Sequence, residues 1–438
     1  MSRQRRKKSG EKQLELSWQG RGLAAGAGAD FERALQSFSE FGTETKVLST
    51  SFSMPELAEA ELSVPVYVNE FWTAKQRQAS SLQEISYRAC FKPQLPRFFI
   101  ERLTKDGDAV YDPFMGRGTS LVEAALLGRI PYGCDVSPLS RCLVEPRLQV
   151  PSSEAIAERL EGVDFKQDVE LPEELLTFYH PDTLREICSL RHYLLEREKS
   201  GDLDAVDGWI RMVALNRLTG HSPGFFSVYS LPPNQAVSVK SQEKINVRRN
   251  QVPPRRLVPD LILKKSRRLL KGTSPEELER VSGFGDNALI LNQLAHETPE
   301  IESESVALVV TSPPFLDVVD YATDNWLRCW FIGIDAKSIS MTVPRKLEQW
   351  ESAMTDVFLE LNRVLRPGGF VAFEVGEVRK GKVKLESAVL RCGFRAGLEP
   401  GLVMINDQAF TKTANCWGIN NNTKGTNSNR VVVFSKPD

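Results

Sequence analysis

Histidine and cysteine are scarce in this sequence, and this limits the chemistry that it can perform. There are four histidines and seven cysteines among 438 residues. The cysteines are scattered, odd in number and without a Cys-x-x-Cys pair, which argues against a disulfide framework and against a zinc site. They are Cys90, Cys134, Cys142, Cys188, Cys329, Cys392 and Cys416. We therefore expect a reduced, cytoplasmic protein that holds no metal.

Long apolar runs and an excess of charge are also missing. No segment is apolar over the length that a bilayer span needs, and the basic N-terminus is not followed by an apolar stretch, so neither a membrane span nor a secretory signal is supported. Basic and acidic residues number 56 and 57. Any affinity for nucleic acid must therefore come from local segregation of charge.

Three catalytic signatures are absent as well. The sequence has no glycine-rich phosphate loop ending in Gly-Lys-Ser/Thr, no histidine spacing suited to a metal, and no nucleophile elbow around Ser or Cys. Phosphoryl transfer, metal-dependent hydrolysis and acyl transfer thus lack their usual residues.

One strand–helix–strand unit is predicted over residues 109–135. A strand over 109–111 leads into a glycine-bearing loop, a helix follows, and a second strand ends at Asp135. Such a unit requires a parallel sheet. Gly116 and Gly118 let the backbone approach a ligand at the helix N-terminus, and Asp135 can bind two ribose hydroxyls. The candidate cofactor-binding residues are Asp112, Pro113, Phe114, Gly116, Gly118, Thr119 and Asp135. A dinucleotide is disfavoured because Leu121 occupies the position of the third glycine.

A second candidate site follows the apolar run 306–310, where the chain continues as Thr311-Ser312-Pro313-Pro314-Phe315. Prolines cannot continue a ladder, so the strand should end here, at the sheet edge where ligands bind. Phe315 can stack on a flat ring, while Ser312 and the Pro313 carbonyl accept hydrogen bonds from an amino group. This would point the nitrogen lone pair at an electrophile such as a sulfonium methyl.

Basic residues are concentrated in residues 240–271. The segment contains eleven Lys and Arg residues but only two acidic residues, Glu243 and Asp260. A polar, aromatic loop over 219–235 precedes it. This segregation favours a phosphate-contacting surface over a solvated helix face. The candidate nucleic-acid-binding residues are Lys240, Lys244, Arg248, Arg249, Arg255 and Arg256.

The remaining pattern predicts an α/β protein with a largely helical insertion. Helices are expected over 95–100, 153–160, 183–195, 205–218, 288–296, 352–365 and 384–392, and strands over 370–375, 401–405 and 430–435, with another strand ending at Asp286. The last two strands suit an antiparallel hairpin at one sheet edge.

Over residues 71–437, apart from the insertion, the chain resembles the S-adenosylmethionine-dependent amino-methyltransferases of DNA. DPFMGRGT at 112–119 is similar to that family's cofactor motif and TSPPF at 311–315 to its catalytic motif. YRACFKPQLPRFFI at 87–100 is similar to the segment beside the methionine moiety, and GTNSNRVVVF at 425–434 to the final strand. The resemblance implies a Rossmann-like class I methyltransferase sheet, S-adenosylmethionine as cofactor and DNA as partner.

The resemblance also implies roles and boundaries. Asp135 would hold the ribose, Asp286 the adenine amino group, and Ser312, Pro313, Pro314 and Phe315 would be catalytic. Serine at the first catalytic position favours N4 of cytosine over N6 of adenine, on a base flipped out of the duplex, in a setting such as restriction-modification. We expect a disordered basic tail over 1–30, a lead-in and cofactor half over 31–144, the insertion over 145–275 and a catalytic half over 276–438. The insertion precedes the strand expected to end at Asp286, whereas in the family's pattern the insertion follows that strand. Whether the insertion reads the bases therefore stays open.

Three alternatives remain at this point. An RNA base methyltransferase shares the chemistry and also binds a polyanion. A protein-glutamine methyltransferase would want Asn before the two prolines. A non-catalytic nucleic-acid-binding protein with a vestigial cofactor fold would keep only the basic surface. Glu374 and Glu377 follow a strand end, where they either line the site or form a salt bridge.

Overall fold

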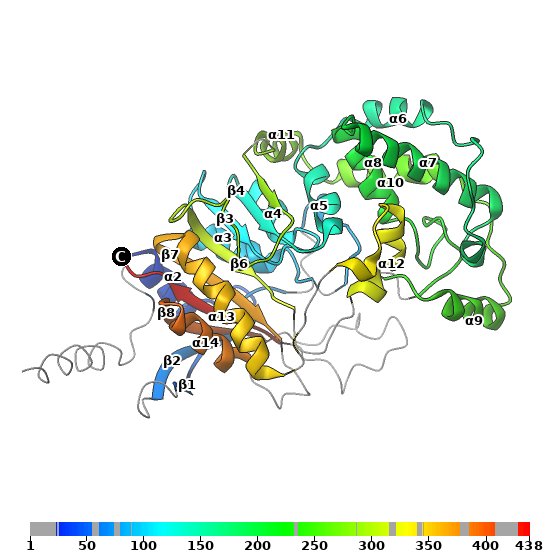
Figure 1. The fold of residues 1–438 in the computed structure, drawn as a ribbon. Helices are drawn as coiled ribbons and strands as arrows, with labels where there is room; N and C mark the ends of the chain where they lie inside the picture. The colour runs from blue at the N-terminus through cyan, green and yellow to red at the C-terminus, as the bar shows by residue number, and fades with distance from the viewer. Residues whose placement is uncertain are drawn as a thin grey trace, which may run out of the picture.

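The structure, a computed structural model, has a sheet covered by helices on both faces and a helical region beside it (Figure 1). It describes residues 23, 26–54, 61–73, 79–88, 90–231, 235–285, 287–314, 321–339, 344, 346–376, 385–407 and 428–438.

A single sheet of nine strands organises the described residues, in the order β1-β2-β8-β9-β7-β6-β3-β4-β5. The strands are β1 (Lys46–Ser53), β2 (Glu61–Asn69), β3 (Ala109–Asp112), β4 (Ile130–Cys134), β5 (Leu289–Leu291), β6 (Val306–Thr311), β7 (Leu365–Val375), β8 (Glu399–Asp407) and β9 (Ser428–Ser435). Strands β5, β4, β3, β6 and β7 are mutually parallel, and β9 runs antiparallel to β7 and β8. The predicted α/β class and mostly parallel sheet are confirmed.

The predicted antiparallel hairpin is present as β8 and β9, but it does not lie at the edge of the sheet. Strand β2 pairs with β8 in parallel, and β1 forms the edge beyond it. Sequence analysis did not predict β1 or β2. Most of β1 is exposed, so it lacks the alternation of a half-buried strand, and Pro65 interrupts the apolar pattern of β2.

Two predictions next to Asp286 were wrong. Residues 281–285 do not end a strand, because helix α11 (Pro275–Gly283) covers most of them. Ser274 caps this helix in a capping box with Glu277, and Pro275 occupies its first turn, a combination that favours a helix start. The expected helix over 288–296 is instead the strand β5, whose three residues are too few to show a strand period.

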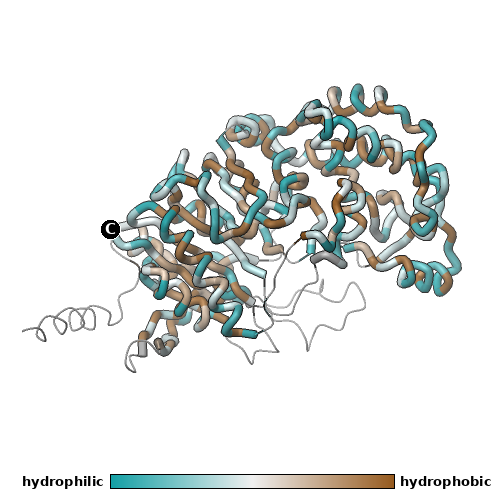
Figure 2. The backbone as a smooth tube through the Cα atoms, in the orientation of Figure 1, coloured by the Kyte–Doolittle hydropathy of each residue, from teal (hydrophilic) through white to brown (hydrophobic). Residues whose placement is uncertain are grey.

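Helices cover both faces of the sheet, as the layers of an α/β fold require. One face packs on α2 (Ala27–Gln36), α3 (Gln94–Leu103) and α4 (Thr119–Leu126), and the other on α13 (Leu347–Val364) and α14 (Leu385–Arg395). Figure 2 shows the hydrophobic residues concentrated inside these layers. The helix predicted at 95–100 is therefore confirmed as α3. Helix α2 begins inside the expected tail of residues 1–30, of which 1–22, 24 and 25 lie outside the described residues.

The helical region lies between β4 and β5 in the chain. Its helices are α5 (Pro138–Val144), α6 (Ser153–Glu161), α7 (Pro181–Ser200), α8 (Ala205–Leu215), α9 (Val239–Arg249), α10 (Val258–Lys271) and α11. The helices expected near 153–160, 183–195 and 205–218 are present. Helix α12 (Tyr321–Phe331), which follows β6, packs its Leu327 and Phe331 into the same hydrophobic core. The helical region is thus built from two separate stretches of chain.

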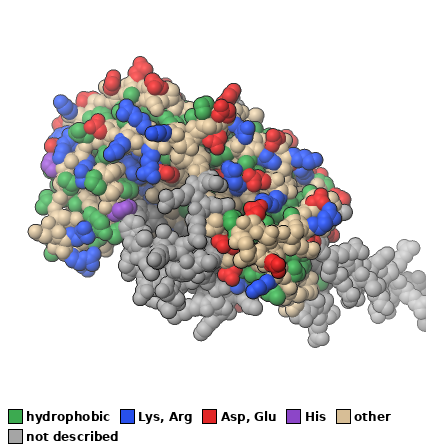
Figure 3. Space-filling view, turned by 180° about the vertical axis from the view of Figure 1, so that it is seen from behind, with side chains coloured by type: hydrophobic (Ala, Val, Ile, Leu, Met, Phe, Trp, Pro, Cys, Tyr) green, Lys and Arg blue, Asp and Glu red, His purple; other side chains and the backbone are tan. Residues whose placement is uncertain are grey.

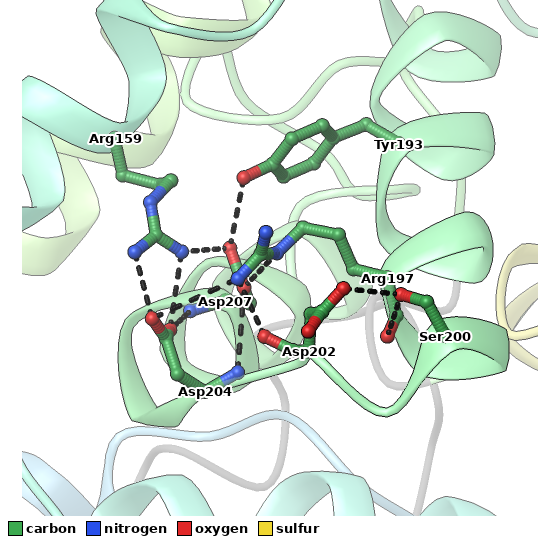
Figure 4. Close-up of polar contacts among 7 residues, drawn as sticks. All are labelled: Arg159, Tyr193, Arg197, Ser200, Asp202, Asp204 and Asp207. Atoms are coloured by element: carbon green, nitrogen blue, oxygen red, sulfur yellow. Dashed lines mark hydrogen bonds and ion pairs between the residues drawn. The ribbon is translucent and has the colours of Figure 1, made fainter.

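A buried ionic cluster joins three helices of this region (Figure 4). The Asp207 carboxylate, fully buried in α8, accepts hydrogen bonds from Arg159 of α6 and from Arg197 of α7, the latter at 2.6 Å. Asp204 pairs with Arg159 at 2.7 Å, and this hydrogen bond lowers the pKa of Asp204 to about 2. Because its carboxylates are already paired with guanidinium groups, we assign the cluster to structure rather than to catalysis.

Candidate functional site

Five neighbouring parallel strands present polar residues at one edge of the sheet. In spatial order β5 is followed by Asn292, β4 by Asp135, β3 by the glycine-bearing loop and β6 by Ser312, while Glu374 lies near the end of β7. The carboxyl ends of parallel strands meet at one edge. The two motifs, separated in sequence by the whole helical region, are therefore brought together.

The two motifs are joined by a buried hydrogen bond between β3 and β6. Thr311 Oγ1 donates to Asp112 Oδ1 at 2.6 Å, and Ser120 Oγ donates to Asp112 Oδ2 at 2.8 Å. Asp112 also accepts from the Phe114 N–H at 3.1 Å. Both oxygens of Asp112 are thus engaged within the protein. Burial raises the pKa of this carboxyl to about 6.

Asp112 should make stability fall as the pH rises. Its carboxyl keeps a proton in the folded protein up to about pH 6, whereas the ordinary pKa of this side chain is 3.8. The bound proton therefore stabilises the fold at low pH, and this stabilisation is lost as the pH rises from about 3.8 to about 6. Relative to Asp112→Asn, we expect the wild-type unfolding free energy to drop by about 2.5 kcal/mol between pH 4 and pH 7. Urea unfolding at four pH values measures this. The exposed Asp164→Asn is the control, and a pH-independent difference between wild type and Asp112→Asn would contradict the prediction.

The glycine-bearing loop needs glycine at position 118, both for its backbone conformation and for packing. Gly118 caps α4 in the left-handed region at φ 74°, and a Cβ there would lie 2.5 Å from Val144. The Gly116 N–H donates to Asp135 Oδ2 at 2.9 Å, and the Ser137 N–H donates to Asp135 Oδ1 at 2.8 Å. Asp135 therefore ties the loop to the end of β4, and burial raises its pKa.

Two arginines, which sequence analysis did not select, hold the lead-in segment 81–85 against the glycine-bearing loop. Arg117 donates to the carbonyl of Ile85 at 2.6 Å, and its Nε donates to the Thr119 hydroxyl at 3.1 Å. Arg147, fully buried, donates to the carbonyls of Arg117 and Leu82. Thr119 is thus engaged by the loop itself. Arg117 lies inside the cofactor motif, but no local pattern marks Arg147.

The catalytic motif is held by residues from two other elements. Ser312 Oγ donates to Glu374 Oε2 at 2.6 Å, and Asn429 Nδ2 donates to Glu374 Oε1 at 3.0 Å. Trp350 of α13 donates its Nε1–H to the carbonyl of Pro314 at 3.0 Å. Burial raises the pKa of Glu374. Of the two interpretations of Glu374, the structure thus favours the one in which it lines the site.

Three candidates lie outside the described residues: Phe315, Asp286 and Glu377. The strand that was expected to end at Asp286 does not exist, so the polar residue at the carboxyl end of the third strand is Asn292. Its Nδ2 donates to the carbonyl of Asp135 at 2.8 Å.

A cavity opens beside Asp135, at the carboxyl ends of β4 and β5. Its volume is about 360 Å³, and its lining is largely apolar. Val136, Pro138, Gln293, Leu294, Ile334 and Ile339 contribute to the walls. A flat, partly polar group the size of a purine base would fit such a cavity.

The predicted nucleic-acid-binding residues fall into two groups. Lys240, Lys244, Arg248 and Arg249 are exposed on α9. Arg255 instead donates to Glu186 at 2.6 Å, and Arg256 is half-buried. Figure 3 shows Lys and Arg side chains gathered on one face of the helical region. The exposed charge of the candidate group is therefore concentrated on α9.

Two properties of the described residues bear on metal binding and on membrane insertion. Within the described ranges, no group of three or more His, Cys, Asp and Glu side chains is arranged to hold a metal ion. Among the helices described, none has both the length and the apolar character that crossing a membrane demands.

Residues 11–139 match the family model described as DNA methylase. The chain is 26% identical over 252 residues to the type II methyltransferase M.MvaI of Kocuria varians, covering 53% of this chain and 52% of that protein. It is 24% identical over 319 residues to the type II methyltransferase M.BsoBI of Geobacillus stearothermophilus, covering 63% of this chain and 59% of that protein. The chain thus spans little more than half the length of these relatives.

Among solved structures, TrmN from Thermus thermophilus aligns with 80% of this chain and 50% of its own, at 13% identity and a TM-score of 0.30. A TM-score this low carries no argument about function. The family model and the two type II methyltransferases agree with each other. These sequence matches support the resemblance of the chain to the DNA amino-methyltransferases.

Proposed function

We propose that this protein transfers a methyl group from S-adenosylmethionine to an exocyclic amino group of a base in DNA, with N4 of cytosine preferred over N6 of adenine. The observation that carries the proposal is the hydrogen bond from Ser312 to the buried Glu374, beside the glycine-bearing loop. It orients a hydroxyl at the sheet edge where the loop, Asp135 and the cavity also lie.

The residues at this edge suit an adenosine-type cofactor. The left-handed Gly118 packs against Val144 and places the loop at the N-terminus of α4, where backbone N–H groups can bind a ligand. Asp135 keeps acceptor capacity for ribose hydroxyls, since each oxygen receives one backbone N–H. The adjoining cavity has apolar walls for a base. S-adenosylmethionine, the cofactor of this family, supplies an electrophilic methyl group when bound.

The Ser312–Glu374 pair defines how an amine is oriented. Because Ser312 donates its hydrogen to Glu374, the lone pairs of Oγ are left to accept an N–H of the target. The Pro314 carbonyl is engaged by Trp350, so we assign the second acceptor to the Pro313 carbonyl. Two N–H bonds directed at these oxygens turn the nitrogen lone pair toward the methyl donor, while Phe315 stacks on the base.

Glu374 also offers a destination for the proton that the amine must lose. Burial raises the pKa of its carboxyl, so it accepts a proton more readily than an exposed glutamate. Ser312 can relay the proton to Glu374 or release it to water. The target base must leave the duplex stack to reach Ser312, and the exposed cations of α9 suit the flanking phosphates.

Expression in a methylation-free host, followed by DNA sequencing with modification-sensitive reads, tests the proposal. We expect N4-methylcytosine at a single sequence motif and none with Ser312→Ala. N6-methyladenine instead would overturn the base preference while keeping the chemistry. Methyl transfer to RNA but not to DNA would overturn the substrate, and saturable cofactor binding without any transfer would favour the non-catalytic alternative.

A further inference from the structure

The loop between α8 and α9 combines a packed interior with an exposed tip. We call residues 219–231 the recognition loop. Phe225, Phe226 and Val228 are buried, whereas His221 and Pro223 are exposed. Such a loop presents a short polar tip on a rigid base, unlike a loop that is mobile throughout.

Backbone hydrogen bonds fix the recognition loop. The Phe226 N–H donates to the Arg217 carbonyl at 2.8 Å, and the Ser230 N–H donates to the Gly220 carbonyl at 2.9 Å. Gly220 is required here because a Cβ would clash with the ring of Phe225. Gln242 and Gln251 each donate to the Tyr229 carbonyl at 3.0 Å, which ties the end of the loop to α9.

One arginine stacks on an aromatic ring at each end of the loop. The Arg217 guanidinium carbon lies 4.1 Å from the centre of the Phe225 ring, and that of Arg249 lies 3.8 Å from the centre of the Tyr229 ring. Stacking holds a guanidinium in one orientation. Arg217 also donates to the carbonyls of Asn216 and Gly224, whereas the exposed Arg249 has N–H groups directed to solvent that can reach a phosphate oxygen. The exposed Lys264, Arg267 and Lys271 on α10 extend the same basic segment.

Both flanks of the loop are bonded to elements that border the candidate active site. On one side Asn216 accepts from the Ser86 N–H at 2.8 Å, next to the carbonyl of Ile85 that Arg117 holds. On the other side the Ala236 N–H donates to the Asp324 carbonyl at 3.1 Å, and Trp326 donates to the Val237 carbonyl at 3.2 Å. Asp324 and Trp326 belong to α12, the first helix after the catalytic motif.

We propose that the recognition loop enters a DNA groove beside the target base and reads its neighbours. His221 and Ser222 at the tip contact base edges, since an imidazole and a hydroxyl both donate and accept hydrogen bonds. Arg249 contacts a flanking phosphate and fixes the register, while Arg217 holds the base of the loop. The inference rests on the proposed DNA methyl transfer and assigns its sequence specificity to this loop.

The test compares sequence discrimination in His221→Ala, Ser222→Ala and their double variant with wild type. Methyl-transfer rates are measured on duplexes with the cognate motif and on duplexes with one base pair changed. We expect the cognate preference to fall by about tenfold or more at one or two positions, with unchanged cofactor affinity. His192→Ala, which removes another exposed histidine on α7, should keep the wild-type preference. Arg249→Gln should weaken binding to all duplexes alike and reduce the salt dependence.

The outcomes separate this inference from the proposed function. Wild type that methylates no DNA refutes the proposed function and the inference with it. Wild type that methylates one motif, together with a double variant of unchanged discrimination, overturns the inference alone. If a variant no longer transfers methyl groups, its sequence discrimination is measured as the ratio of its affinities for cognate and random DNA. A ratio equal to that of wild type contradicts the role of the recognition loop. His221→Gln, which changes the tip least, covers the case of a variant that fails to fold.

Discussion

Ser312→Ala is expected to lower kcat by about 100- to 1000-fold, because the target amine loses the acceptor that orients its lone pair. The change also removes one of the two side-chain hydrogen bonds that the buried Glu374 accepts and leaves the one from Asn429. Cofactor affinity should stay the same, since Ser312 follows β6, whereas the candidate cofactor residues lie at the ends of β3 and β4 and in the loop after β3. Single-turnover transfer of labelled methyl to a cognate duplex measures kcat, and calorimetry measures cofactor binding.

Two further variants show whether the loss reflects chemistry. Ser189→Ala removes a fully buried serine of α7 and should leave kcat unchanged. Glu374→Gln keeps the shape of the side chain but removes its charge, so Ser312 is no longer held as a donor, and we expect an intermediate loss of kcat. Equal losses of cofactor affinity and kcat in Ser312→Ala would point to a collapsed site and contradict the proposed role.

Local patterns predicted the parts of the fold that carry strong local signals. The strand–loop–helix–strand unit over 109–135 was found because a β-branched strand, two glycines and a terminal acid follow each other within one stretch. Strand β1 was missed because it is an edge strand that pairs with β2 alone, and most of it is exposed. Strand β5 was missed because three residues carry no period, while the cap of α11 was overlooked.

The candidate site likewise contains residues that sequence motifs indicate and residues that only the fold brings to the site. Asp135 and Ser312 lie in motifs, so the sequence indicates them directly. Glu374, Trp350 and Arg147 act on those motifs from β7, α13 and the turn after α5, and their roles depend on contacts that only the folded chain creates. The strand expected to end at Asp286 was wrong for the opposite reason: an acid after glycine looked like a strand end, although the preceding residues form helix α11.

Asp135→Ala should weaken S-adenosylmethionine binding by about 100-fold, since hydrogen bonds to a charged carboxylate contribute roughly 1.5–3 kcal/mol each and a ribose offers two hydroxyls. The loss of affinity should exceed the loss expected from removing the ribose hydrogen bonds alone. Asp135 also accepts from the Gly116 and Ser137 N–H groups, so its removal loosens the loop that faces the cofactor. Calorimetric titration with S-adenosylmethionine and with S-adenosylhomocysteine should show the same loss, because the two ligands share the adenosine.

A matched pair of variants separates these two effects of Asp135. Asp135→Asn retains a side-chain oxygen for one backbone N–H, so it should preserve more of the loop and more of the affinity than Asp135→Ala. Asp356→Ala, an exposed acid on α13, should bind the cofactor as wild type does. If Asp135→Ala bound S-adenosylmethionine with wild-type affinity, the carboxylate would serve the loop only. The ribose would then have to be held elsewhere at this edge, and Asn292, the polar residue after β5, would be the first position to change.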